Sequence, residues 1–114
     1  MNLNRKKISI TKHAELRMME RMPDVRKKQY QQIVNTARYR GEATARLMAK
    51  YPEIMQFVKS RKMSNSTVIR LYNDFVFVFK GCENNSRTLI TLYPLPEDLV
   101  TKIHADEKTE AIKS

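Results

Sequence analysis

The stretch TVIRLYNDFVFVF, residues 67–79, decides the fold of this chain. Two runs of β-branched and aromatic residues flank Asn73-Asp74, a pattern that predicts a β-hairpin with a two-residue turn between Tyr72 and Phe75. Side chains then alternate between two faces. One face receives Arg70, Tyr72, Phe75, Phe77 and Phe79, and the other receives Ile69, Leu71, Val76 and Val78. Because the second run is apolar on both faces, it is predicted to be a central strand covered on both sides.

The sequence after the hairpin predicts one more strand and then a tail. Residues 81–86 favour a loop, residues 87–93 a third strand, and Pro94 and Pro96 end that strand. The expected sheet, residues 67–95, is therefore a three-stranded antiparallel β-meander. From residue 97 we expect a short helix over Leu99 and Ile103, followed by a flexible tail over residues 105–114.

The sequence before the hairpin predicts helices. Residues 8–10 suit an edge strand or a lead-in, Thr11 can cap a helix over residues 12–22, and Pro23 ends it. A second helix is expected over residues 25–39, with Gly41 as its stop. A third helical segment, residues 43–62, is expected to be divided by Pro52, and residues 63–66 form a polar linker. The prediction is one α+β domain over residues 1–114, with a helical basic part at 11–62 followed by the sheet.

Positive charge is concentrated in the amino-terminal half. Residues 1–62 hold 16 Lys and Arg against 5 Asp and Glu, whereas residues 63–114 hold 6 against 7. The whole chain carries a net charge of +10. This asymmetry is typical of a polyanion binder, with a solvated basic surface as the bland alternative.

The sharpest functional pattern lies in the first predicted helix. His13, Arg17 and Arg21 recur every four residues and would share one helix face, where like charges repel unless a negative partner binds. A phosphate-bearing polymer is the natural partner. The sequence predicts that further nucleic-acid contacts come from Lys12, Arg26, Lys27, Lys28, Arg38 and Arg40.

Several other chemistries are poorly supported. The two histidines are 91 positions apart and accompany a single cysteine, Cys82, so the sequence predicts no metal site. Gly41 and Gly81 are the only glycines, which excludes a glycine-rich phosphate loop, and we expect no cofactor. A lone cysteine, the lack of a recognisable secretory signal and the lack of an apolar membrane span lead us to expect a cytoplasmic protein with no membrane partner.

Metal-free cleavage of RNA is compatible with these residues. It needs a general base for the 2′-hydroxyl, a general acid for the leaving oxygen and cations for the phosphorane oxygens. His13 would transfer a proton, and Arg17 and Arg21 would hold the phosphate. Thr91 and Tyr93, which share one face of the last strand, are the candidates for the second group.

The chain resembles a known superfamily in two stretches, one around His13 and one around Thr91. His13, Ala14, Arg17 and Arg21, with the later run 89–93 (Leu-Ile-Thr-Leu-Tyr), look like the superfamily of barnase, EndoU, colicin and RelE-type ribonuclease toxins, and most like its short bacterial and phage members. The likeness covers roughly residues 8–40 and 67–95, and residues 43–63 depart from it as an added helical segment. It implies candidate catalytic roles for His13, Arg17 and Thr91, and less directly for Arg21 and Tyr93.

Two hypotheses follow. The first is an RNA-binding toxin-fold protein, a metal-independent endoribonuclease if it is catalytic, whose protein partner would be an antitoxin. The second is a non-catalytic binding module, encoded by a phage or mobile element, that engages nucleic acid or an acidic host protein. An inhibitor that mimics nucleic acid fits poorly, because mimicry requires an acidic face. The bland alternatives are a His13 that bonds a loop carbonyl, and packing roles for Thr91, Tyr93 and the phenylalanine row.

Overall fold

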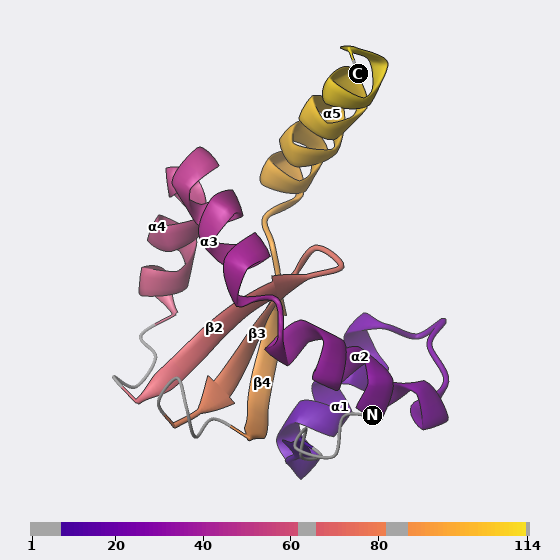
Figure 1. Cartoon of the computed structure of the whole chain (residues 1–114). Coiled ribbons are helices and arrows are strands. Elements are labelled where there is room, and N and C mark those ends of the chain that lie inside the picture. Colours follow the sequence, from indigo (N-terminus) through magenta and orange to yellow (C-terminus); the bar gives the residue numbers. More distant parts are fainter. Residues whose placement is uncertain (1–7, 62–65, 82–86, 114) are drawn as a thin grey trace, which may run out of the picture.

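A computed structural model describes residues 8–61, 66–81 and 87–113 of the chain. Arg5, Lys6, Lys7, Cys82 and most of the linker and loop predicted at 63–66 and 81–86 lie outside the described residues. The fold is α+β, with helices on both sides of a four-stranded mixed sheet (Figure 1). Its elements are β1 Ser9–Ile10, α1 Lys12–Arg21, the 3₁₀ turn η1 Lys27–Gln29, α2 Tyr30–Arg38, α3 Gly41–Lys50, α4 Pro52–Ser60, β2 Thr67–Tyr72, β3 Phe75–Lys80, β4 Thr88–Pro94 and α5 Glu97–Lys113.

The predicted hairpin is confirmed in its register. Tyr72 pairs with Phe75 across the turn, and Arg70 pairs with Phe77. Asn73 and Asp74 have φ angles of 51° and 67°. Two successive positive φ values characterise the type I′ turn, whose twist matches that of paired strands. Asparagine and aspartate tolerate this region better than most residues, so the pair forms the turn without a glycine.

The sheet has one strand more than the predicted meander. β2, β3 and β4 are antiparallel in sequence order, as expected, but the sheet order is β1-β4-β3-β2 and β1 runs parallel to β4. The Ser9 N–H donates to the Arg87 carbonyl at 2.7 Å, and the Thr11 N–H donates to the Leu89 carbonyl at 3.1 Å. The prediction of a purely antiparallel three-stranded sheet is therefore wrong, because this short amino-terminal segment pairs with the distant last strand.

The predicted coverage of the central strand on both faces is confirmed. On one face, Phe77 and Phe79 pack with Ala14 and Met18 of α1 and with residues of α2. On the other face, Val76 and Val78 pack with residues of α3, α4 and α5. The register of β3 against β4 shifts between Val78 and Phe79, where Val78 pairs with Thr91 and Phe79 with Leu89. The two helical layers thus stand on opposite sides of one sheet.

Two helix boundaries in the first half of the chain differ from the predictions. The second helix was expected from residue 25, but η1 precedes α2, which begins only at Tyr30. Gly41 starts α3 rather than stopping a helix, while Pro52 divides the next segment as predicted and occupies the first turn of α4.

The helix predicted from residue 97 is longer than expected, because α5 continues through the predicted tail to Lys113. The second half of α5 contacts the end of α3 and the residue after it through side chains. The Tyr51 hydroxyl donates to Asp106 Oδ2 at 2.7 Å, and Lys50 forms an ion pair with Glu110. Nearer its start, Lys102 Nζ lies 3.1 Å from Glu53 Oε2. These contacts join residues about 50 to 60 positions apart, so no local pattern indicates them.

Candidate nucleic-acid interface

The predicted row on α1 lies on the outer part of that helix. Thr11 Oγ1 accepts the Ala14 N–H at 3.1 Å, which fixes the start of the helix. Ala14 and Met18 then face the sheet and are fully buried. His13 is consequently exposed, while Arg17 and Arg21 are half-buried at the side of the helix.

The three members of the row differ in their partners. Arg17 forms an ion pair with Glu20 at 3.1 Å, one turn further along. Among the described residues, His13 and Arg21 have no ion pair or side-chain hydrogen bond. Glu20 therefore neutralises the middle of the row and leaves both ends available to an anion.

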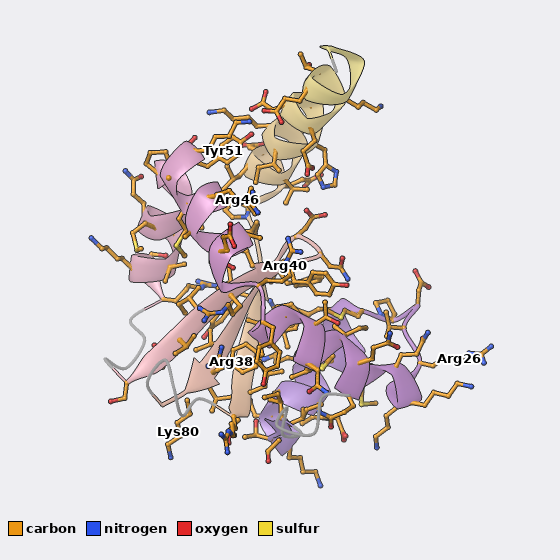
Figure 2. All side chains as sticks on the ribbon, in the orientation of Figure 1. Arg26, Arg38, Arg40, Arg46, Tyr51 and Lys80 are labelled. Carbon is orange, nitrogen blue, oxygen red and sulfur yellow. The ribbon has the colours of Figure 1, made fainter. Side chains whose placement is uncertain are left out.

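A second set of cations follows α1 in the chain. Lys27 Nζ lies 3.4 Å from Glu15 Oε1, which ties η1 to the first turn of α1. Lys12, Arg26 and Lys28 are exposed, and within the described part of the chain their side chains have no ion pair. Figure 2 shows Arg26 projecting away from the body of the molecule at the edge of this layer. We call the basic side chains of α1, η1 and the residue before η1 the basic layer; they are Lys12, His13, Arg17, Arg21, Arg26, Lys27 and Lys28.

Arg38 and Arg40, which the sequence also predicts to bind nucleic acid, make internal contacts. Arg38 is only 8% exposed, and its guanidinium lies 5.7 Å from the ring of Tyr39. Arg40 Nε donates to the Leu71 carbonyl at 3.0 Å, and its guanidinium lies 5.1 Å from the ring of Tyr72. Figure 2 places both side chains near the centre of the molecule, beside the sheet. Their first role is therefore structural.

This structural role is to cover the outer edge of β2. Arg40 satisfies the carbonyl of Leu71, and Thr44 Oγ1 accepts the Leu71 N–H at 2.9 Å. Arg70 Nε donates to the Arg38 carbonyl at 3.0 Å, at the end of α2. Unpaired edge groups invite association with other strands, and the junction between α2 and α3 removes part of that edge.

Thr91 and Tyr93 do not join the row on α1. Thr91 pairs with Val78 and Tyr93 with Val76, so both side chains project from the sheet face that α3, α4 and α5 cover. Thr91 is 9% exposed, and its hydroxyl has no hydrogen-bond partner in the described structure. Tyr93 is half-buried, with the Arg61 guanidinium 4.9 Å from its ring. The sheet separates them from His13, so these residues form no shared site.

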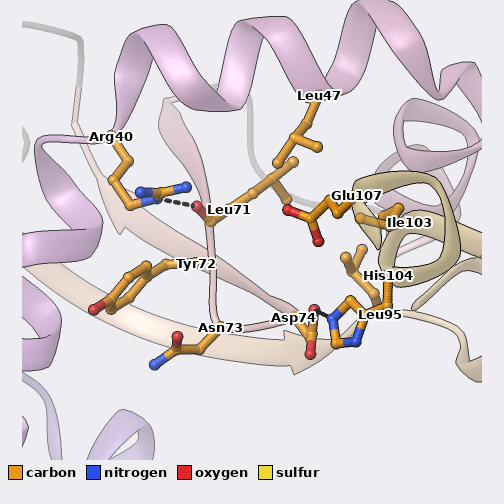
Figure 3. Close-up of a pocket in the computed structure, with 10 residues that line it drawn as sticks. All are labelled: Arg40, Leu47, Leu71, Tyr72, Asn73, Asp74, Leu95, Ile103, His104 and Glu107. Carbon is orange, nitrogen blue, oxygen red and sulfur yellow. Dashed lines mark hydrogen bonds and ion pairs between the residues drawn. The ribbon is translucent and has the colours of Figure 1, made fainter. Parts of the chain in front are cut away.

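The structure brings together a different set of polar residues at the end of the sheet. A pocket of about 290 Å³ lies between α3, the hairpin turn and α5. Arg40, Tyr72, Asp74, His104 and Glu107 lie around it (Figure 3). His104 Nε2 lies 2.8 Å from Asp74 Oδ1. The sequence pattern predicts no role for His104, because its partner lies 30 positions earlier in the chain.

The pKa values of three side chains are shifted where α5 meets α3 and α4. The hydrogen bond to Asp106 raises the pKa of Tyr51, and the contact with Glu110 raises the pKa of Lys50. The backbone N–H of Glu53 and then Lys102 lower the pKa of the Glu53 carboxyl. Among the described residues, no group of three or more His, Cys, Asp or Glu side chains is placed to hold a metal ion. No helix of the described chain has the length and apolar character needed to span a membrane.

Comparison with known proteins gave no relative from which a role could be transferred. The chain matches no protein-family model, no curated protein and no solved structure, so its resemblance to ribonuclease toxins stays a prediction.

Proposed function

We propose that this protein binds nucleic acid, with RNA favoured, through the basic layer, and that it does so without cleaving it. The observation that carries the proposal is the set of exposed cations on α1 and η1 that have no ion pair within the described structure, above all Lys12, Arg26 and Lys28. Cations of this kind bind phosphates and release condensed counterions, which supplies most of the sequence-independent affinity for nucleic acid.

The position of the cations supports a binding role. Arg26, Lys27 and Lys28 stand at and just before the start of a helical segment, where the helix dipole disfavours positive charge. No acidic side chain lies in the first turn of η1 or α2 to offset this cost. A bound phosphate would offset it.

Binding is favoured over cleavage because the two predicted candidates for a second proton-transfer group do not lie beside His13. Thr91 and Tyr93 project from the opposite face of the sheet, and Thr91 is buried there. General acid–base catalysis requires both groups within hydrogen-bond reach of one phosphate. The arrangement therefore supports the second hypothesis, a non-catalytic binding module.

An acidic protein is the second candidate partner, and two side chains favour it. Leu16 and Met19 are 48% and 52% exposed on the outer face of α1, beside the cations. Exposed apolar residues surrounded by charge suit a protein interface better than a phosphate backbone. Their substitution would discriminate the two partners, because Leu16→Ser with Met19→Ser should leave RNA affinity nearly unchanged.

The proposal is tested by fluorescence anisotropy with labelled single-stranded RNA over a range of salt concentrations. Arg26→Gln with Lys28→Gln should weaken binding and reduce the slope of log K against log salt by about 1.4, because about 0.7 is expected for each lost contact to single strands. Lys59→Gln with Lys108→Gln removes the same charge from α4 and α5 and should have a much smaller effect. Equal effects of the two pairs, or binding that does not respond to salt, would contradict the proposal.

The same samples test cleavage. RNA incubated with the wild-type protein in EDTA should remain intact. Fragments that end in 2′,3′-cyclic phosphate and disappear with His13→Ala would overturn the non-catalytic part of the proposal.

A further inference from the structure

A cleft lies where α1 ends and meets the hairpin turn. It has a volume of about 230 Å³, and Arg21, Met22, Asp24, Val25, Asn73 and Phe75 contribute to its walls. The cleft thus joins the last residue of the predicted row, Arg21, to the tip of the sheet. The basic residues Arg26 and Lys28 follow Val25 closely in the chain.

The walls of this cleft combine an apolar interior with a charged rim. Met22 is buried, and Val25 and Phe75 are partly buried and pack against the core between α1, α2 and the sheet. Asn73 is exposed and is held at φ 51° by the tight turn. An aromatic ring beside aliphatic side chains offers a surface on which a flat ring can stack.

Arg21 supplies a cation at the rim. Its side chain is half-buried, and it has no ion pair or side-chain hydrogen bond among the described residues. A partly desolvated guanidinium is well suited to a phosphate, which it can bind through two parallel hydrogen bonds. Asp24, which also lines the cleft, disfavours a phosphate deep inside but can accept hydrogen bonds from a neutral ring.

We propose that this cleft receives one unpaired base of a single-stranded nucleic acid while Arg21 holds the adjacent phosphate. The inference rests on the proposed function and deepens it, because it names the form of nucleic acid that the basic layer prefers. Bases of a duplex are stacked and paired, and only an unpaired base can enter the cleft and stack on Phe75. The strand beyond that base would continue along Arg26 and Lys28.

The test compares a single-stranded oligonucleotide that carries 2-aminopurine with the same strand annealed to its complement. The wild-type protein should bind the single strand several-fold more tightly and change the 2-aminopurine fluorescence on binding. Phe75→Leu keeps an apolar side chain but removes the aromatic ring, and it should lower single-strand affinity at least about fivefold while sparing duplex affinity. Arg21→Gln, at a half-buried side position on its helix, should lower single-strand affinity without changing the fold.

Arg26→Gln is the matched control, since it removes a phosphate contact outside the cleft and should weaken both forms of nucleic acid equally. Wild-type affinities that are equal for single strand and duplex would overturn the inference and leave the proposed function standing. The inference also fails if Phe75→Leu and Arg21→Gln, both shown by circular dichroism to be folded, keep the wild-type preference. Absence of any salt-dependent binding would instead refute the proposed function, and the cleft proposal with it.

Discussion

His13 and Thr91 lie on opposite sides of the β-sheet. His13 is exposed on α1, which covers one face through Ala14 and Met18, whereas Thr91 pairs with Val78 on the other face. The sheet lies between the two side chains and the Thr91 hydroxyl is buried, so a phosphate bound at His13 does not reach that hydroxyl. Thr91 therefore has a packing role in the sheet face that α3, α4 and α5 cover.

Thr91→Val should stabilise the protein by about 1 kcal/mol, because the buried hydroxyl of Thr91 has no hydrogen-bond partner in the described structure. Valine keeps the branched shape and removes the unpaired polar group. RNA affinity should not change, since the side chain is buried on the sheet face opposite α1. Urea denaturation measures the first effect and anisotropy the second. A loss of RNA binding in a folded Thr91→Val protein would restore Thr91 as a candidate functional residue.

Thr44→Val should have the opposite sign. Thr44 is also buried, but its hydroxyl accepts the Leu71 N–H at 2.9 Å at the outer edge of β2. Valine would leave that N–H buried and unpaired, at a cost of about 1–3 kcal/mol. The same urea experiment serves as the measurement. If both threonine variants shift stability in one direction, hydrogen bonding is not the reason for either effect.

The sequence predicted those parts of the fold that depend on local pattern. Alternation over residues 67–79 was enough to establish the hairpin, its register and the two covered faces of β3. The pairing of β1 with β4 was not predictable, because two residues carry no pattern that identifies a partner about 80 positions away. The helix predicted from residue 97 is shorter than α5 for a related reason, since the outer half of α5 is polar and is held by Tyr51 and Lys50 from another part of the chain.

In the candidate site, too, local pattern predicts some features, and contacts between distant residues determine the others. Periodicity correctly placed His13, Arg17 and Arg21 on the outer side of one helix. It could not show which arginines the fold uses internally, so Arg38 and Arg40 were predicted as surface contacts. Only tertiary structure reveals that an arginine completes the edge of a strand.

The attachment of α5 should weaken at alkaline pH. Hydrogen bonding to Asp106 raises the pKa of Tyr51 above its ordinary value of 10.0, and contact with Glu110 raises the pKa of Lys50 above 10.5. A folded-state pKa above the unfolded one means that the contribution to stability is complete below the unfolded pKa. It is lost as pH rises through the folded pKa. Both contacts should therefore be intact below about pH 10 and disappear above it.

Tyrosine absorbance at 295 nm between pH 8 and pH 13 measures this titration. Tyr51→Phe should remove the tyrosine component that ionises at the highest pH, and Asp106→Asn should shift that component down. A Tyr51→Phe titration that lacks no high-pH component relative to the wild type would show that the hydrogen bond to Asp106 is not maintained in solution.

Glu20→Gln should increase RNA affinity. Glu20 pairs with Arg17 at 3.1 Å, so the substitution both removes a negative charge from α1 and frees the middle cation of the row. Exposed pairs of this kind contribute about 0.2–1 kcal/mol, which corresponds to a gain of roughly 1.5- to 5-fold in affinity. Glu97→Gln in the first turn of α5 changes the net charge equally but lies on another layer, and it should have little effect. The gain should shrink at high salt, where phosphate contacts weaken. If Glu20→Gln and Glu97→Gln raise affinity equally, RNA responds to the overall charge of the protein and not to the row on α1.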